Sequence, residues 1–173
     1  MTMSSNFNRV RRAGIASFAA AVLVSTPVWA TNLGYAVDSN NWTFTGAAQV
    51  DILNMRTNVF AKPANKRLIV VFAAECAVNA AAGNTSAWVD VDIVLLNATT
   101  GAVVHTAAPT VGNGDAFCAS NGTAGFDGWA SHSVQALIPY NFPAGNYRVG
   151  VKARLNGGAT GGWFGERMVS VAL

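Results

Sequence analysis

Charged residues are scarce in this sequence. Only 11% of its 173 residues are Asp, Glu, Lys or Arg. Three of the eleven basic residues are Arg9, Arg11 and Arg12, so residues 31–173 hold eight basic and eight acidic residues and no formal net charge. Phosphate backbones are bound by clustered Lys and Arg. The sequence therefore predicts no nucleic-acid partner, and its low net charge is compatible with self-association.

Motifs for metal binding and for nucleophilic catalysis are also missing. The sequence has no Cys-x-x-Cys pair and no His-x-x-x-His spacing. His132 lies between Ser131 and Ser133, but there is no Gly-x-Ser-x-Gly nucleophile motif to accompany it. We therefore assign no catalytic residue and no cofactor, and a hydrolase is the least favoured function.

No apolar run is long enough to cross a bilayer, which takes about 20 residues. The short apolar run 15–24 follows the N-terminal arginines and is followed by a polar segment that ends in Val28-Trp29-Ala30. This order is typical of an export signal with small residues at its cleavage site. The sequence predicts a signal peptide over residues 1–30, a mature domain over 31–173 with no membrane span, and a periplasmic or secreted location.

Two cysteines, Cys76 and Cys118, lie in the mature segment. In an oxidising compartment a pair of cysteines indicates a disulfide. The bridge closes a loop of about 43 residues, which the chain-entropy model values at roughly 4 kcal/mol.

Period-two alternation runs through the mature segment, as in half-buried strands. In residues 88–95 one side is apolar and the other holds Trp88, Asp90, Asp92 and Val94. Residues 147–155 alternate in the same way, with three basic residues on the outer side. The inner sides of these two segments are predicted to be Val89, Val91, Ile93 and Leu95, and Tyr147, Val149, Val151, Ala153 and Leu155.

Other segments complete the predicted fold. The apolar run 68–74 suits a central strand buried on both faces, and in residues 42–60 we expect Val50, Ile52 and Leu53 to face inward. Residues 107–128, rich in Gly and Asn, are predicted to form a long loop that Cys118 pins. Eight to ten short strands at this spacing indicate one all-β domain, an antiparallel β-sandwich or jelly roll with one disulfide.

Two resemblances add to this interpretation. Residues 68–76 and 88–93, with Asp115-Ala116-Phe117-Cys118, residues 121–125 and Asp127-Gly128-Trp129, resemble small exported bacterial proteins of unassigned function. Residues 142–149, Phe-Pro-Ala-Gly-Asn-Tyr-Arg-Val, followed by a Gly-rich turn and a final strand, are similar to prokaryotic C1q/TNF-like domains. The second resemblance implies a ten-strand jelly roll and often a trimer, although the collagen-like Gly-x-y stalk of longer members is missing.

Asp90 and Asp92 form the first candidate site. Two residues apart on a strand, their carboxylates project from the same face about 7 Å apart. Such a pair suits ion pairing with Arg148, Lys152 or Arg154, a calcium site completed by loop oxygens, or the carboxylates of a glycosidase. Pairing is the favoured interpretation, because these three basic residues also face outward. Carboxylates paired in this way are poor general acids.

Trp88, Trp129 and Trp163 form the second candidate site. Flat indole rings can pack against the C–H face of a sugar ring, although large aromatic residues at strand ends also cap a core. We therefore expect an exported, non-enzymatic module with a structural, protein-binding or self-assembly role, with homo-oligomers among its partners. The alternative is a carbohydrate-binding module that takes polysaccharide on these tryptophans.

Overall fold

The computed structural model describes residues 31–107 and 116–173, and all its regular elements are strands. The predicted signal peptide and part of the predicted 107–128 loop lie outside these residues. The strands are β1 (Asn32–Asp38), β2 (Trp42–Thr45), β3 (Val50–Arg56), β4 (Phe60–Lys62), β5 (Leu68–Ala80), β6 (Trp88–Asn97), β7 (Val103–Thr106), β8 (Ala116–Ala119), β9 (Gly125–Ile138), β10 (Gly145–Asn156) and β11 (Gly161–Ala172).

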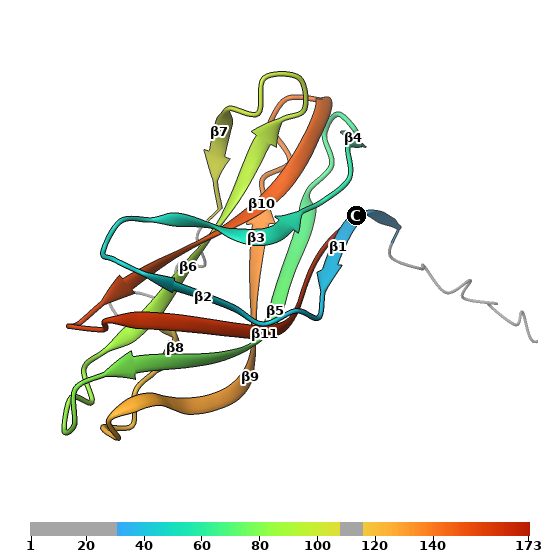
Figure 1. Cartoon of the computed structure of the whole chain (residues 1–173). Helices are drawn as coiled ribbons and strands as arrows, with labels where there is room; N and C mark the ends of the chain where they lie inside the picture. The colour runs from blue at the N-terminus through green and yellow to red at the C-terminus, as the bar shows by residue number, and fades with distance from the viewer. Residues whose placement is uncertain (1–30, 108–115) are drawn as a thin grey trace, which may run out of the picture.

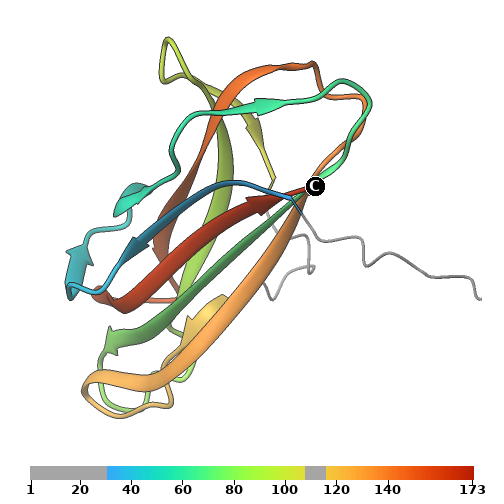
Figure 2. The ribbon, with the colours of Figure 1, turned by 90° about the vertical axis from the view of Figure 1, so that its right-hand side faces the viewer.

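The strands form two antiparallel sheets that pack face to face (Figures 1 and 2). Sheet A has the order β1-β11-β5-β9, with β2 also paired to β11, and sheet B has the order β3-β10-β6-β7, with β4 also on β10 and β8 also on β6. When β1 and β2, β3 and β4, and β7 and β8 are each counted as one interrupted strand, the eight strands lie in the orders 1-8-3-6 and 2-7-4-5. Two four-stranded sheets connected in this way form a jelly roll. The predicted fold class is therefore confirmed.

The core lies between the sheets and follows the predicted alternation in sheet B. Val89, Ile93 and Leu95 on β6 are wholly buried, as is Val149 on β10. Along its entire length β6 pairs with β10, so these side chains form one continuous layer. Burial of such side chains is the main favourable contribution to folding.

Two predictions about buried residues are wrong. β5 is central in sheet A but fully buried on one face only, because its outward residues are exposed, as Ile69 is, or partly exposed, as Val71 and Ala73 are. Leu53 is exposed because it follows the buried Ile52 in regular alternation. A bulge just beyond it, where Asn54 has a left-handed backbone with φ of 61°, leaves Asn54 exposed and turns Met55 inward. A bulge shifts the alternation by one residue, and this shift is not visible in the apolar pattern.

The disulfide Cys76–Cys118 is present, with 6.1 Å between the two Cα atoms. It joins β5 of sheet A to β8 of sheet B and so crosses the sandwich. The prediction that Cys118 lies in a loop is wrong, because residues 116–119 pair with β6 as a short strand.

A buried ion pair closes the core beneath β1. The Arg167 guanidinium donates to Asp38 at 2.7 Å and to the carbonyl oxygen of Leu53 at 3.2 Å. Burial lowers the pKa of Arg167, and the charge of Asp38 opposes this shift. The backbone N–H of Asn40 and the amide of Asn54 lower the pKa of Asp38, with a further contribution from Arg167, while burial opposes them. A paired and fully hydrogen-bonded charge is the form in which an arginine is tolerated in a core.

Candidate functional site

The outer face of sheet B carries the predicted carboxylates and their predicted cations on neighbouring strands. β6 pairs with β10 so that Asp90 lies opposite Arg154 and Asp92 lies opposite Lys152. Asp90 is only 4% exposed and forms an ion pair with Arg154. Asp92 instead accepts a hydrogen bond from the side chain of Gln49.

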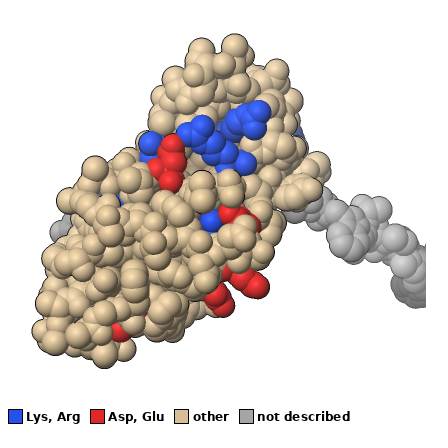
Figure 3. All heavy atoms as spheres, viewed as in Figure 1, with Lys and Arg blue, Asp and Glu red and all other residues tan. Residues whose placement is uncertain are grey.

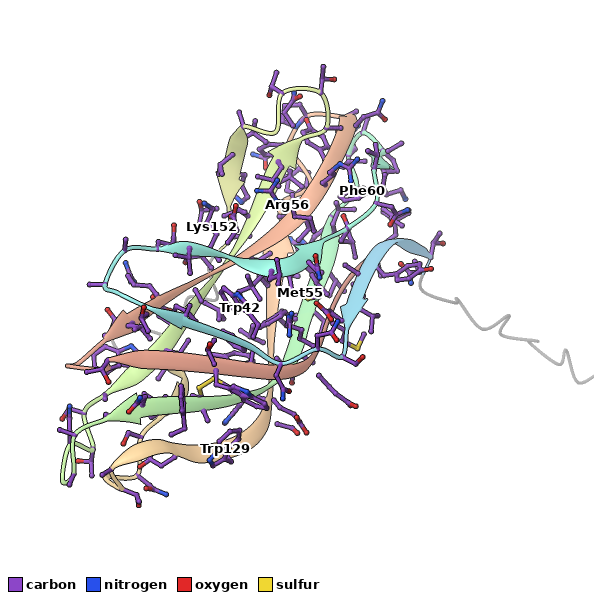
Figure 4. All side chains as sticks on the ribbon, viewed as in Figure 1. Trp42, Met55, Arg56, Phe60, Trp129 and Lys152 are labelled. Carbon is purple, nitrogen blue, oxygen red and sulfur yellow. A yellow bond between two sulfur atoms is a disulfide. The ribbon has the colours of Figure 1, made fainter. Side chains whose placement is uncertain are left out.

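A third acidic side chain, Asp51 of β3, forms ion pairs with the two basic side chains nearest to it. Its carboxylate contacts Arg56 at 2.6 Å and Lys152 at 3.2 Å. Burial raises the pKa of Asp51, but the hydrogen bonds and charges of these two partners outweigh it, and the net shift is downward. Lys and Arg side chains gather over β3 and β10 in Figure 3, and Figure 4 places Arg56 and Lys152 there. The acids and bases of this face largely neutralise one another.

Among the residues that the structure describes, no group of metal ligands gathers around Asp90 and Asp92. In residues 31–107 and 116–173, no three His, Cys, Asp or Glu side chains come together as metal ligands would. His132 is on β9 of sheet A, where it packs against Phe117 with ring centroids 5.5 Å apart, whereas both aspartates are on sheet B. Ser131 and His132 point to opposite sides of β9, so they do not form a nucleophile and its base.

The three predicted tryptophans are divided between the two sheets. Trp88 begins β6 of sheet B and is partly buried, with its ring beside Gly157. Trp129 on β9 and Trp163 on β11 meet on the outer face of sheet A, with ring centroids 4.5 Å apart and planes at 62°. Trp129 is 57% exposed and Trp163 is partly exposed. Two tryptophans therefore form one cluster, edge to face rather than coplanar.

Ala77 lies between the two tryptophans, and its burial shows that their rings cover this part of the sheet. Ala77 of β5 is the register partner of Trp163, and β9 bulges opposite Ala77 so that Gly128 and Trp129 are its neighbours there. Ala77 is wholly buried although it lies on the outer side of the sheet. The two rings therefore cover a patch of β5 backbone and hold each other in place.

A network of local contacts fixes the position of Trp129. Its indole Nε1 donates to the carbonyl oxygen of Phe126 at 3.0 Å. The buried Asp127 carboxylate accepts from the hydroxyl of Ser120 at 3.0 Å and from the backbone N–H of Thr123 at 2.7 Å. Gly128 has a φ of 66°, and an added Cβ would lie 2.2 Å from the carbonyl oxygen of Ala119. Only glycine fits this backbone, which turns Trp129 outward.

We use the name aromatic corner for Phe126, Trp129 and Trp163. Phe126 is also exposed, and its ring lies 6.4 Å from that of Trp129. Figure 4 shows Trp129 on β9 at the end of the sandwich remote from Arg56 and Lys152. The aromatic corner and the ion pairs of sheet B are therefore separate surfaces.

A hollow of about 430 Å³ lies beside the aromatic corner on sheet A. It opens where β11 bulges between Phe164 and Arg167, and Glu75, Glu166 and Ser131 are among its lining residues. Glu75 connects the hollow to the corner, because a Cβ added at Gly165 would lie 2.4 Å from both the Glu75 carboxylate and the Trp163 ring. Glu75 and Glu166 are exposed, and neither forms an ion pair with any other described residue.

Sequence reasoning missed Phe126, Glu75 and the hollow. The signal for the corner was the run Asp127-Gly128-Trp129, in which a buried acid and an obligatory glycine precede an exposed tryptophan. The hollow depends on a bulge in β11, for which Gly165-Glu166 is the only sequence trace.

The described part of the chain is thus a jelly-roll domain with one neutralised outer face and one aromatic outer face. No protein-family model matches the sequence, and no curated protein matches it. No helix in residues 31–107 and 116–173 is long and apolar enough to span a membrane.

Solved structures with a similar fold include the capsid protein VP2 of infectious bursal disease virus. In its subviral particle VP2 is 15% identical, with 80% of this chain and 31% of VP2 aligned at a TM-score of 0.48. In the Gt strain it is 16% identical, with 84% and 33% aligned at 0.47. A xylan-binding module, CBM15, is 13% identical over 82% of this chain and 95% of its own, with a TM-score of 0.28. The chain spans about a third of VP2, and these likenesses concern the fold alone.

Proposed function

We propose that this protein is an exported, non-catalytic binding module, and that its contact surface is the outer face of sheet A. The observation that carries the proposal is the contrast between the two outer faces. Exposed apolar side chains gather on sheet A, namely Tyr35, Val37, Ile69, Phe126, Trp129, Leu137 and Met168. Contiguous exposed apolar surface of this kind typically marks an interaction site.

Export is part of the proposal and rests on the order of charged, apolar and small residues in 1–30 and on the disulfide, a bond that persists in oxidising compartments. The full chain, expressed in a bacterium with a periplasm, should be recovered from the periplasm or medium with Thr31 as its first residue. Edman sequencing and intact-mass measurement check this. A cytoplasmic protein that keeps residues 1–30 would contradict it.

Self-association is a second candidate function for the same face. Tyr35 and Val37 lie in register with Ser170 and Met168, which gives a flat apolar edge on β1 and β11. Because residues 31–173 carry no formal net charge, no long-range repulsion opposes contact between copies. If the face binds a second copy, light scattering should give a mass above that of one chain, and a trimer would agree with the C1q/TNF-like resemblance.

The test compares the two outer faces with matched substitutions. The double variant Tyr35→Ser with Met168→Ser removes exposed apolar surface from sheet A, whereas the double variant Val103→Ser with Val104→Ser removes it from β7 of sheet B. Only the first should lower the association measured by light scattering or the retention on a ligand. If both variants lower association or retention equally, or if neither variant lowers it, sheet A is excluded as the contact surface.

A further inference from the structure

We infer that the aromatic corner and the hollow beside it form one binding site for an uncharged polysaccharide. This inference rests on the proposed function, since it names the partner of the same face. It differs from the sequence-based alternative in excluding Trp88, which lies on the other sheet, and in adding Glu75, Glu166 and Ser131 as polar partners.

Within the corner, Trp129 provides a flat apolar ring whose position is already fixed before a ligand arrives. Trp129 is held by its own hydrogen bond to Phe126 and by packing on Trp163. A sugar ring that packs its C–H face on Trp129 therefore immobilises no further side chain, and this lowers the entropic cost of binding. An edge-to-face neighbour leaves one broad face of Trp129 open, so the geometry suits a single ring at this position.

The hollow provides hydrogen-bond acceptors next to that ring. Glu75 and Ser131 are register partners on adjacent strands, and Glu75 also lies against Trp163. Ionised carboxylates only accept hydrogen bonds, and sugar hydroxyls are donors that can satisfy them. A volume of about 430 Å³ lies within the range of about 300–1,000 Å³ that is typical of small-molecule sites.

The charges of the hollow decide between kinds of polysaccharide. His132 and Arg167 also line the hollow. Arg167 is the one Lys or Arg in the strands of sheet A, and its side chain is wholly buried in its ion pair with Asp38. A chain of uronic acids would therefore meet the exposed Glu75 and Glu166, and the strands of sheet A offer no exposed Lys or Arg to bind it. Repulsion between like charges disfavours such a ligand, whereas an uncharged chain can bond to both carboxylates.

The test measures how much mature protein each insoluble polysaccharide removes from solution. Cellulose, chitin and starch granules represent uncharged polysaccharides, and gelled polygalacturonate represents acidic ones. We expect retention on at least one uncharged probe, with little loss in 0.5 M NaCl, and none on polygalacturonate. Trp129→Ala should weaken retention at least about tenfold, as expected for a central aromatic contact. Glu75→Gln, which retains an acceptor but loses the charge, should weaken it about fivefold.

The matched control is Tyr140→Ala. Tyr140 is an aromatic residue, 58% exposed, in the turn before β10. Its replacement therefore removes a similar area of exposed aromatic surface at a position away from the proposed site. Its retention should equal that of the unmodified protein, and urea unfolding should show that all three variants remain folded. Glu75→Gln keeps the test decisive if Trp129→Ala unfolds.

No retention on any of the three uncharged probes would overturn the inference, as would equal retention by Trp129→Ala and the unmodified protein. Retention that high salt abolishes would also overturn it, because it would indicate a cationic contact with the carboxylates. Light scattering on the same samples measures self-association, and so distinguishes failure of the polysaccharide inference from failure of the proposed function. Loss of association in Trp129→Ala without polysaccharide binding would leave sheet A as the contact surface, whereas no effect on either property would refute both.

Discussion

The two outer faces of the sandwich differ although both are antiparallel sheets over one core. On sheet B the register places Arg154 opposite Asp90, and Asp51 finds both Arg56 and Lys152. On sheet A, Glu75 lies opposite Ser131 and has no cation as a register partner. Strand register therefore decides whether an acidic residue is neutralised by its neighbours or left available to a ligand.

The largest expected effects lie beneath the faces rather than on them. Ile93→Ala under sheet B and Leu68→Ala in sheet A should each cost about 2–5 kcal/mol in the free energy of unfolding, because both side chains are wholly buried. Leu137→Ser on the outer face of sheet A should stay within about 0.5 kcal/mol. Urea unfolding measures all three. A cost for Leu137→Ser as large as that for Leu68→Ala would show that the outer face of sheet A is itself core.

The next effect concerns the backbone of the aromatic corner. Gly128→Ala and Gly101→Ala both place Ala at a positive φ, of 66° and 70°, but only Gly128 has backbone within reach of the new Cβ. The control Gly101→Ala should cost about 1–2 kcal/mol for its conformation. Gly128→Ala should cost about 1–3 kcal/mol more for the clash with Ala119. Equal unfolding midpoints would mean that the corner is not held as rigidly as described.

Acid should weaken the fold through one aspartate on each sheet. The pKa values of Asp51 and Asp38 are lowered in the folded protein. Each therefore stabilises the fold above its unfolded pKa of about 3.9, and this stabilisation is lost as the pH falls through that value toward the folded pKa. Urea midpoints measured from pH 7 down to pH 3 should decline. The decline should be shallower in Asp51→Asn, and an identical slope would indicate that the pairs on sheet B do not act on stability.

The smallest effect is that of the exposed ion pairs. A double-mutant cycle on Asp51 and Arg56, with both replaced by Ala, should give a coupling of about 0.2–1 kcal/mol that decreases in 1 M NaCl. Retention on polysaccharide should not change in any of these variants, because the pair lies on sheet B. Loss of retention in Asp51→Ala would remove the distinction between the two faces.

The features that the sequence predicted correctly are those that depend on residues close together along the chain, such as which side of a strand each side chain faces. Alternation placed Ile93 inside and Asp92 outside, and two cysteines in a neutral, export-like sequence predicted the disulfide. Alternation assigns a side of a strand but does not say which sheet the strand joins, so Trp88 was grouped with Trp129 although they lie on different sheets. Sheet membership depends on pairings such as β1 with β11, which join opposite ends of the chain.

Irregular backbone accounts for most of what the sequence did not reveal. Asn54 is exposed and Met55 is buried because of a bulge in β3, and the hollow opens at a bulge in β11. A bulge inserts one residue into a strand and reverses the alternation beyond it. Both bulges contain residues that also occur in regular strands, so composition alone does not locate them.

The order of the strands has a consequence for the time at which the protein can fold. β10 pairs with β3, β4 and β6 in sheet B, and β11 pairs with β1, β2 and β5 in sheet A, so each sheet is completed by one of the last two strands of the chain. A chain emerging from the ribosome has only the pairings of β5 with β9 and of β6 with β7 and β8 until residues 145–172 are made. Non-local pairing of this kind is slow, because long loops must close before the contacts form. The chain therefore remains open for most of its synthesis, and a translocation channel that accepts only unfolded protein would have that interval in which to engage it.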